Sequence, residues 1–137
     1  MSLERFAGFT IVFVAHALEQ RYARGLRSLG ISVRDFVLLA EIDQRPGLSQ
    51  SVLAERVGLT RARVSEQLAV LDRAGYVTRE MNRIDLRKRR LWISHPGQVV
   101  LEEAKARLDL IDAGWLSTLD LRARPFFTAA VRELALL

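Results

Sequence analysis

Basic side chains crowd around a single carboxylate in the stretch from Arg83 to Ser94, RIDLRKRRLWIS. Its charged residues are Arg83, Asp85, Arg87, Lys88, Arg89 and Arg90. A segment with this density of cations is suited to binding a polyanion, because Lys and Arg side chains neutralise phosphates and release the counterions bound to them. A solvated loop or a flexible basic tail would also explain the charge, but neither explains the aspartate or the apolar residues that follow. The stretch is therefore predicted to belong to a folded hairpin.

A second set of polar side chains gathers at the start of a predicted helix. The set comprises Thr60, Arg61, Arg63, Ser65 and Gln67. Val64 is expected to point inward, which leaves Arg61 and Arg63 near the exposed N-terminal end of the helix. Such an end can enter the major groove of DNA, where arginine makes bidentate contacts with guanine. An ordinary helix pair with a solvated polar face is the alternative at this point.

The positive charge of the chain is concentrated around these two sets. Between Thr60 and Leu91 there are nine Lys and Arg residues against four Asp and Glu residues. That excess equals the net charge of the whole chain, +5, so the remainder is balanced. A surface that is merely solvated would not be expected to concentrate its excess charge there, whereas a nucleic-acid interface would.

The composition and motifs give little support to redox, metal-binding or catalytic chemistry. The chain has no cysteine and only two histidines, His16 and His95, which argues against disulfides, thiolate sites and histidine-rich metal sites. The sequence shows no Ser/His/Asp set, no paired catalytic carboxylates and no glycine-rich phosphate loop. We therefore predict that the chain is not an enzyme and that it needs no cofactor or metal.

One apolar run, from Phe6 to Ala17, resembles the hydrophobic part of a signal peptide. The acidic Glu4 precedes it, and the run is shorter than the roughly 20 residues that span a bilayer. Its bulky residues recur at steps of three and four, which is typical of one apolar face of a long helix. We therefore expect an amphipathic helix, no membrane span and a cytoplasmic protein.

The remaining patterns predict a mostly helical domain with one hairpin. Half of the residues are hydrophobic (50%), enough to form a core. Helices are expected from about Leu3 to Leu29, from Ser32 to just before Arg45, from Ser49 to Gly58, from Thr60 to Ala74, from Pro96 to about Leu119, and from Pro125 onward. Two short strands are expected at Tyr76–Arg83 and Arg90–Ser94, on either side of the basic residues.

The third and fourth of these helices have the features of a helix-turn-helix. Ala54 is small enough for a close crossing, and Gly58 can adopt the left-handed backbone that the turn requires. Apolar residues are expected on the inner faces: Leu53, Val57, Val64, Leu68 and Leu71. The hairpin that follows would form a wing beside the pair.

The segment LAERVGLTRARVSEQLAVLDRAGYVTR, followed by DLRKRRLWISHPG, resembles the MarR family of bacterial winged-helix transcriptional regulators. The most specific feature is the pair Asp85-x-Arg87 with further basic residues behind it. A strand then ends at Ile93-Ser94, before a glycine at position 97. The local match covers roughly Leu48 to Gly97, and the flanking helices fit the family layout in order and length.

This resemblance implies a fold that is mainly α with a small β-hairpin, in one domain spanning residues 1–137. A winged helix-turn-helix at 32–95 would be flanked by dimerisation helices at 1–30 and 96–137. The resemblance also implies a homodimeric repressor that binds double-stranded DNA at a pseudo-palindromic operator. In such proteins the wing arginine reaches the minor groove and the aspartate holds the wing in shape, which are roles for Arg87 and Asp85. Many members are released by small phenolic or other aromatic ligands, which implies a small aromatic effector.

Two features leave other interpretations open. Glu66 stands where members often carry a basic residue, and it could repel phosphate or accept a hydrogen bond from a cytosine amine. A winged-helix protein–protein adaptor without specific DNA binding is therefore the alternative function. The aromatic residues Phe6, Phe9, Phe13 and Trp115 could line an effector pocket, but we expect them in the dimer core.

Overall fold

The computed structural model describes residues 5–80 and 89–136. Within these ranges the chain is mostly helical, with one small sheet, as predicted. The elements are α1 (Ala7–Leu26), η2 (a 3-10 turn, Arg27–Leu29), α2 (Val33–Gln44), β1 (Leu48–Ser49), α3 (Gln50–Val57), α4 (Arg61–Arg73), β2 (Val77–Glu80), β3 (Arg90–Ile93), α5 (His95–Leu116) and α6 (Ala123–Leu134).

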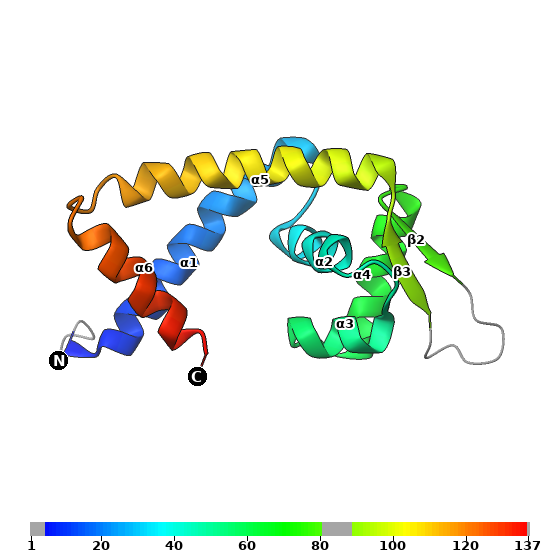
Figure 1. Cartoon of the computed structure of the whole chain (residues 1–137), viewed down its shortest axis with the longest axis horizontal. Coiled ribbons are helices and arrows are strands. Elements are labelled where there is room, and N and C mark those ends of the chain that lie inside the picture. Colours follow the sequence, from blue (N-terminus) through cyan, green and yellow to red (C-terminus); the bar gives the residue numbers. More distant parts are fainter. Residues whose placement is uncertain (1–4, 81–88, 137) are drawn as a thin grey trace.

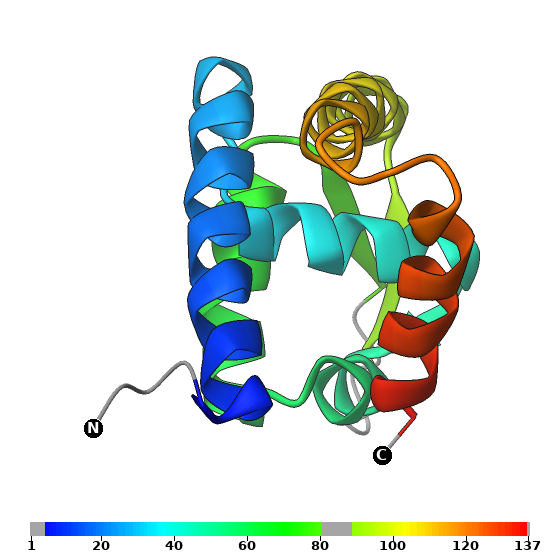
Figure 2. The ribbon, with the colours of Figure 1, turned by 90° about the vertical axis from the view of Figure 1, so that its left-hand side faces the viewer.

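The long helix α5 joins two differently built ends of the molecule. In Figure 1 it extends along the top, with α2, α3, α4 and the sheet below one half, while α1 and α6 descend from the other half. Figure 2, turned by 90°, shows α1 and α6 standing apart on opposite sides. The helix-turn-helix lobe is therefore compact, whereas the other end is open.

The hydrophobic core lies in the lobe and under the first half of α5. Leucine, isoleucine and valine side chains from several elements are fully buried there: Leu26, Leu38, Leu39, Ile42, Leu53, Val64, Leu68, Leu71, Val77, Leu91 and Leu101. Burying one such side chain contributes roughly 1.5–3 kcal/mol. The core therefore fixes α4 and the sheet against α2 and α5, which are the elements that position the predicted site.

Side-chain hydrogen bonds confirm three predicted helix starts and show that Ser94 caps α5, which begins at His95, one residue before the predicted Pro96. The hydroxyl oxygens of Ser32, Ser49, Thr60 and Ser94 accept from the backbone N–H three residues further on, at 3.0, 3.2, 3.2 and 3.1 Å. Each bond satisfies a donor that the first turn of a helix leaves without an internal partner. The cap at Thr60 fixes where the helix with the candidate site begins.

The sheet has three strands where a two-stranded hairpin was predicted. Strands β2 and β3 pair antiparallel, with Val77 opposite Ile93 and Glu80 opposite Arg90. The additional strand β1 pairs with the other edge of β3, where Leu48 lies opposite Leu91. A strand of two residues has no alternating pattern of its own, so only its partner identifies it.

Some helix ends also differ from the predictions. Helix α1 begins at Ala7 and ends at Leu26, and the 3-10 turn η2 completes the stretch that was predicted as helix up to Leu29. Helix α5 ends at Leu116, before the predicted Leu119. Helix α6 begins at Ala123, so Pro125 lies within its first turn, where a missing N–H costs nothing.

Candidate nucleic-acid interface

The turn between α3 and α4 has the geometry of a helix-turn-helix. Ala54 is buried, so the two helices approach closely at that point. Gly58 ends α3 with φ +67°, in the left-handed region that favours glycine. The backbone N–H of Leu59 donates to the carbonyl of Ala54 at 3.1 Å, which closes the turn. Both small residues have the roles predicted for them.

One face of helix α4 is packed in the core, and the side chains at its N-terminal end are exposed. Val64, Leu68 and Leu71 hold it in the core. Around its N-terminal end, Thr60, Arg61 and Arg63 are exposed and Ser65 is partly buried, so the structure brings these four predicted residues together. Because one face of α4 is buried, the helix is held in place. Its exposed first turn can therefore present side chains to a groove of DNA.

Arg61 and Arg63 keep their charges available. Within residues 5–80 and 89–136, neither guanidinium is paired with a carboxylate. Arg79 on β2 behaves differently, because its Nη2 donates to Asp72 Oδ2 on α4 at 2.9 Å. The Arg79 pair joins the sheet to the helix, whereas the two arginines at the helix start have no carboxylate partner in the part of the chain that the structure describes.

Gln67 is positioned differently from the other predicted residues of α4. It is partly buried, and its Nε2 donates to Oδ1 of Asp35 in the first turn of α2. Asp35 also lies in the capping box at the start of α2. The Ser32-x-x-Asp35 spacing is a signal for a capping box, but nothing in the sequence connects that box with Gln67.

The base of the wing is fastened to residues on both sides of β1. The carbonyl of Arg89 accepts from the backbone N–H of Gln50 at 3.0 Å, and Arg90 Nη1 donates to the carbonyl of Gly47 at 3.3 Å. Leu91 is fully buried, so the apolar end of the basic stretch attaches the strand to the core. The predicted site residues Arg83, Asp85, Arg87 and Lys88 lie outside the described residues.

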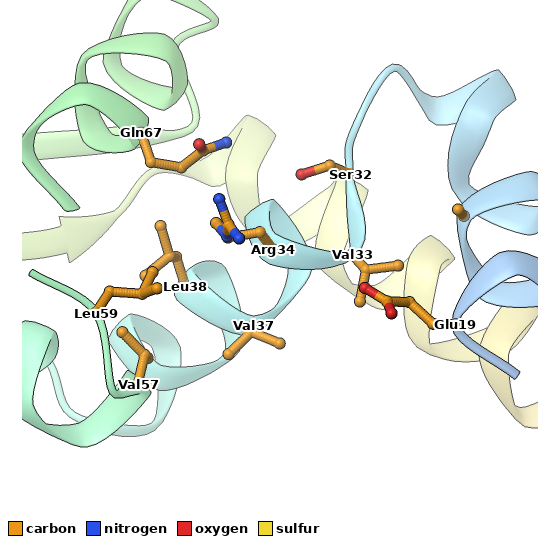
Figure 3. A pocket seen from close by; sticks show the side chains of 10 residues that line it. Glu19, Ser32, Val33, Arg34, Val37, Leu38, Val57, Leu59 and Gln67 are labelled. Atoms are coloured by element: carbon orange, nitrogen blue, oxygen red, sulfur yellow. The ribbon is translucent and has the colours of Figure 1, made fainter. Parts of the chain in front are cut away.

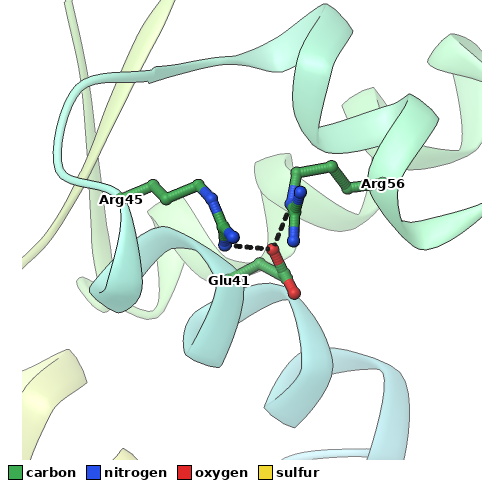
Figure 4. Close-up of polar contacts among 3 residues, drawn as sticks. All are labelled: Glu41, Arg45 and Arg56. Carbon is green, nitrogen blue, oxygen red and sulfur yellow. Dashed lines mark hydrogen bonds and ion pairs between the residues drawn. The ribbon is translucent and has the colours of Figure 1, made fainter.

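An ionic cluster braces the first helix of the turn (Figure 4). Oε2 of Glu41 on α2 accepts from Arg56 Nε on α3 at 2.6 Å and from Arg45 Nη1 at 3.0 Å. The hydrogen bond from Arg56 is the main reason why the pKa of Glu41 lies below its usual value, and the charges of both arginines act in the same direction. The cluster therefore ties α3 to α2 beside the core.

An open cavity of about 530 Å³ lies between α1, α2 and the helix-turn-helix (Figure 3). Figure 3 shows Gln67 extending from α4 toward Ser32, which caps α2, and toward Arg34 on α2, with Glu19 of α1 on the far side. The cavity is lined by Glu19, Ala23, Ser32, Val33, Arg34, Val37, Leu38, Val57, Leu59 and Gln67. Because its lining comes from four separate segments, the sequence alone could not have indicated it.

The described part of the chain offers neither a metal cluster nor a membrane span. In residues 5–80 and 89–136, His, Asp and Glu side chains form no group of three or more that could hold a metal ion. Across the same ranges, every helix is too short or too polar to cross a bilayer.

Comparison with known proteins identifies relatives of the whole arrangement. The family model described as MarR family matches residues 29–88. The transcriptional regulator HosA of Escherichia coli is 30% identical over 99 residues, which are 72% of this chain and 73% of HosA. The HTH-type transcriptional repressor Rv2887 of Mycobacterium tuberculosis is 28% identical over 112 residues, 82% of this chain and 81% of Rv2887.

Solved structures share the fold. Rv2887 in complex with salicylic acid is 26% identical, covers 93% of this chain and 95% of its own, and has a TM-score of 0.75. Rv2887 in complex with DNA is 24% identical, covers 93% and 96%, and has a TM-score of 0.81, so it supports the fold alone. Since HosA is 30% identical over more than two thirds of both chains and the family model covers the helix-turn-helix, the chain belongs to the MarR family.

Proposed function

We propose that the chain is a homodimeric, sequence-specific DNA-binding transcriptional regulator that acts as a repressor. The observation that carries the proposal is the exposed pair Arg61 and Arg63, which have no carboxylate partner among the described residues and begin a helix whose opposite face is locked in the core. Such a helix can enter the major groove, where arginine reads guanine. Two relatives support it, since HosA is a transcriptional regulator and Rv2887 is a repressor that has been solved with DNA.

The proposal gives every predicted residue except Gln67 a place on the duplex. Major-groove contacts are assigned to Thr60, Arg61, Arg63 and Ser65. Arg87 is assigned to the minor groove and Asp85 to the support of the wing, on the family resemblance alone. Arg83, Lys88 and Arg89 are assigned to phosphates. Since the proposed target is chromosomal DNA, the proposed place of action is the cytoplasm, and no reaction is assigned to the chain.

The proposal also divides the chain by role. Residues 32–95 would form the DNA-binding lobe, and residues 1–30 and 96–137 would form the dimerisation helices. Apolar side chains on α1 and α6 support this division, because a single chain leaves them exposed: Phe9, Val12, Phe13, Phe126, Phe127, Val131 and Leu134. Exposed apolar surface on this scale marks an interface.

Replacing Arg63 with alanine tests whether this residue contacts DNA. Operator fragments are first selected from genomic DNA, and fluorescence anisotropy then measures their affinity across a salt series. Arg63→Ala is expected to weaken binding by about 1–3 kcal/mol if it reads a base, or to reduce the salt slope by about one unit if it contacts phosphate. The matched control is Arg27→Ala, an exposed arginine outside the lobe. Unchanged affinity and slope would remove Arg63 from the interface, and uniform weak binding to all fragments would favour the adaptor.

We further propose that the cavity between α1 and the lobe binds a small aromatic acid as effector. Its volume of about 530 Å³ lies in the range of small-molecule sites, and its lining combines aliphatic side chains with one cation, Arg34, and one anion, Glu19. A carboxylate could pair with that guanidinium, while the ring contacts Val33, Val37 and Leu38. The relative Rv2887 has been solved with salicylic acid, which supports this ligand class.

Filling the cavity tests the effector proposal. Salicylate is the probe, and it is expected to lower the operator affinity of the unchanged chain. Ala23→Trp places an indole at the cavity wall and is expected to abolish that response, whereas Ala106→Trp, exposed on α5 outside the lining, is expected to preserve it. A salicylate response that survives Ala23→Trp would locate the ligand elsewhere.

A further inference from the structure

The hydrogen bond between Gln67 and Asp35 connects the candidate recognition helix α4 to the start of α2. Asp35 is the one buried charged side chain among the described residues, with 6% of its surface exposed. Its Oδ2 accepts from the backbone N–H of Ser32 at 2.8 Å, and its Oδ1 accepts from Gln67 Nε2. One oxygen therefore completes the capping box of α2, and the other holds α4.

The hydrogen bond from Gln67 is important because the carboxylate of Asp35 is buried. A carboxylate removed from water needs a donor for each oxygen, because an unsatisfied charge in a protein interior is costly. The N-terminus of α2 stabilises the charge through its free N–H groups and its dipole. Gln67 supplies the remaining donor and does so from another helix, so the bond fixes one turn of α4 against α2.

The location of the bond relates it to both proposed activities. Gln67 follows Arg63 by four residues, so the two lie on neighbouring turns of the same helix side. Ser32 and Gln67 also line the cavity between α1 and the lobe. A change in this bond would therefore alter the part of α4 that carries the arginines, next to the proposed effector.

We propose that Gln67 is a positioning residue for DNA recognition, which acts through Asp35 and does not itself contact the bases. The proposal rests on the DNA-binding function proposed above. It assigns Gln67 a different task from that of Arg61 and Arg63, because its amide already serves the buried carboxylate and is turned toward α2 (Figure 3). Operator affinity should then depend on the pair and not on either side chain alone.

A double-mutant cycle on operator affinity tests this dependence. Gln67→Met keeps the length of the side chain but removes the donor, and it is expected to weaken operator binding about tenfold, as for a lost bond to a charged group. In the Asp35→Ala background the same exchange should have no further effect, because the partner is already absent. If the two losses multiply, Gln67 contacts DNA directly and the proposal is wrong.

A swap of the two groups provides a test by rescue. Gln67→Glu places two carboxylates together and is expected to weaken operator binding. Adding Asp35→Asn should restore much of the affinity, because the new amide can donate to the carboxylate introduced at position 67 and its oxygen can still accept from Ser32. Failure of the second exchange to improve binding would contradict the proposal. The swap remains decisive if Asp35→Ala does not fold, since both of its members keep the capping oxygen.

Controls separate this proposal from the function on which it rests. Gln44→Met makes the same exchange at an exposed position at the end of α2, and it should leave operator affinity unchanged. Thermal unfolding confirms that each compared variant is folded at the binding temperature. If the unchanged chain selects no operator, the proposed function fails. If the unchanged chain binds an operator and Gln67→Met binds it equally well, only the positioning role fails.

Discussion

Gly97, in the first turn of α5, lies against the backbone that leads into β2. A Cβ at this position would lie 2.1 Å from the carbonyl oxygen of Tyr76 and 2.8 Å from Ile93 Cγ1. That carbonyl already accepts from the N–H of Ser94 at 3.0 Å, so the backbone has little freedom to move away. Glycine is therefore required where α5 passes the sheet.

Gly97→Ala is expected to destabilise the protein by about 1–3 kcal/mol, because overpacking forces the backbone apart. Urea denaturation measures the loss. Gly114→Ala on the same helix is the control, since its Cβ would meet nothing within 4 Å and alanine favours a helix by up to about 1 kcal/mol. Equal stability of the two variants would show that the close approach at Gly97 is not maintained in solution.

The ionic cluster around Glu41 makes stability depend on pH. Arg56 and Arg45 lower the pKa of Glu41 below its usual 4.5, so the folded state favours the ionised carboxylate. This stability is present above pH 4.5 and is lost as the pH falls through the lower pKa of the folded state. Glu41→Gln should therefore be less stable than the unchanged chain at pH 7, with a difference that narrows in acid. Urea denaturation at a series of pH values measures the difference, and a constant value from pH 7 to 3 would exclude a contribution from this cluster.

At the scale of single residues, the sequence was most informative where one side chain acts locally. The four helix caps and the left-handed Gly58 were predictable because each depends on its nearest neighbours in the chain. The contact from Gln67 to Asp35 spans 32 residues, and the cavity is formed by four segments. Such features depend on packing, which a single sequence does not reveal.

Among the elements, α1 and α5 are joined by polar contacts as well as by packing. Tyr22 on α1 donates its hydroxyl to Asp112 Oδ1 on α5 at 2.5 Å, and Trp115 Nε1 donates to the same oxygen at 2.9 Å. Arg107 of α5 also donates to the carbonyl of Gly25 at 3.2 Å, near the end of α1. The bonds from Tyr22 and Arg107 hold the two helices together beyond the core of the lobe, whereas the bond from Trp115 lies within α5 and orients Asp112.

Burial, together with Asp112, raises the pKa of Tyr22 from 10.0 to about 12. Because the folded pKa is the higher one, the stability conferred by the neutral phenol is complete below pH 10.0 and is lost as the pH rises toward about 12. Tyr22→Phe is expected to cost about 1 kcal/mol at pH 7 and to flatten the decline above pH 10. Thermal unfolding across that range measures both effects. A decline of the same steepness in the variant would assign it to another group.

The short strand β1 shows the limit of prediction at the scale of elements. Helix order followed from apolar periodicity, and β2 and β3 followed from alternation. Leu48 and Ser49 carry no such pattern, and they become a strand only because β3 offers them an edge. The resulting sheet attaches the base of the wing to the segment before α3, which a simple hairpin would not do.

On the scale of the whole molecule, the two ends of the fold differ in how well their apolar side chains are covered. The lobe buries its leucines, while Phe13 on α1 is 59% exposed and Phe126 on α6 is 79% exposed. The two helices stand apart in Figure 2, so neither covers the other. A second copy that supplies its own α1 and α6 would cover these faces, which is why the proposed regulator is a dimer.

Phe13→Asp is expected to convert the dimer to monomer at concentrations where the unchanged chain is dimeric, because it places a charge in an apolar interface. Sedimentation velocity measures the change, and circular dichroism should show that the lobe stays folded, since Phe13 lies outside the core. A variant that remains dimeric would exclude this face of α1 from the interface.

Selection of bound genomic fragments, followed by footprinting, distinguishes a sequence-specific dimer from a protein that binds DNA without preference. A specific dimer should protect a preferred site with two half-sites whose centres lie about 10 base pairs apart, one for each helix α4. Protection should be lost with Arg61→Ala combined with Arg63→Ala. Uniform, weak binding without a preferred fragment at near-physiological salt would contradict the proposed function.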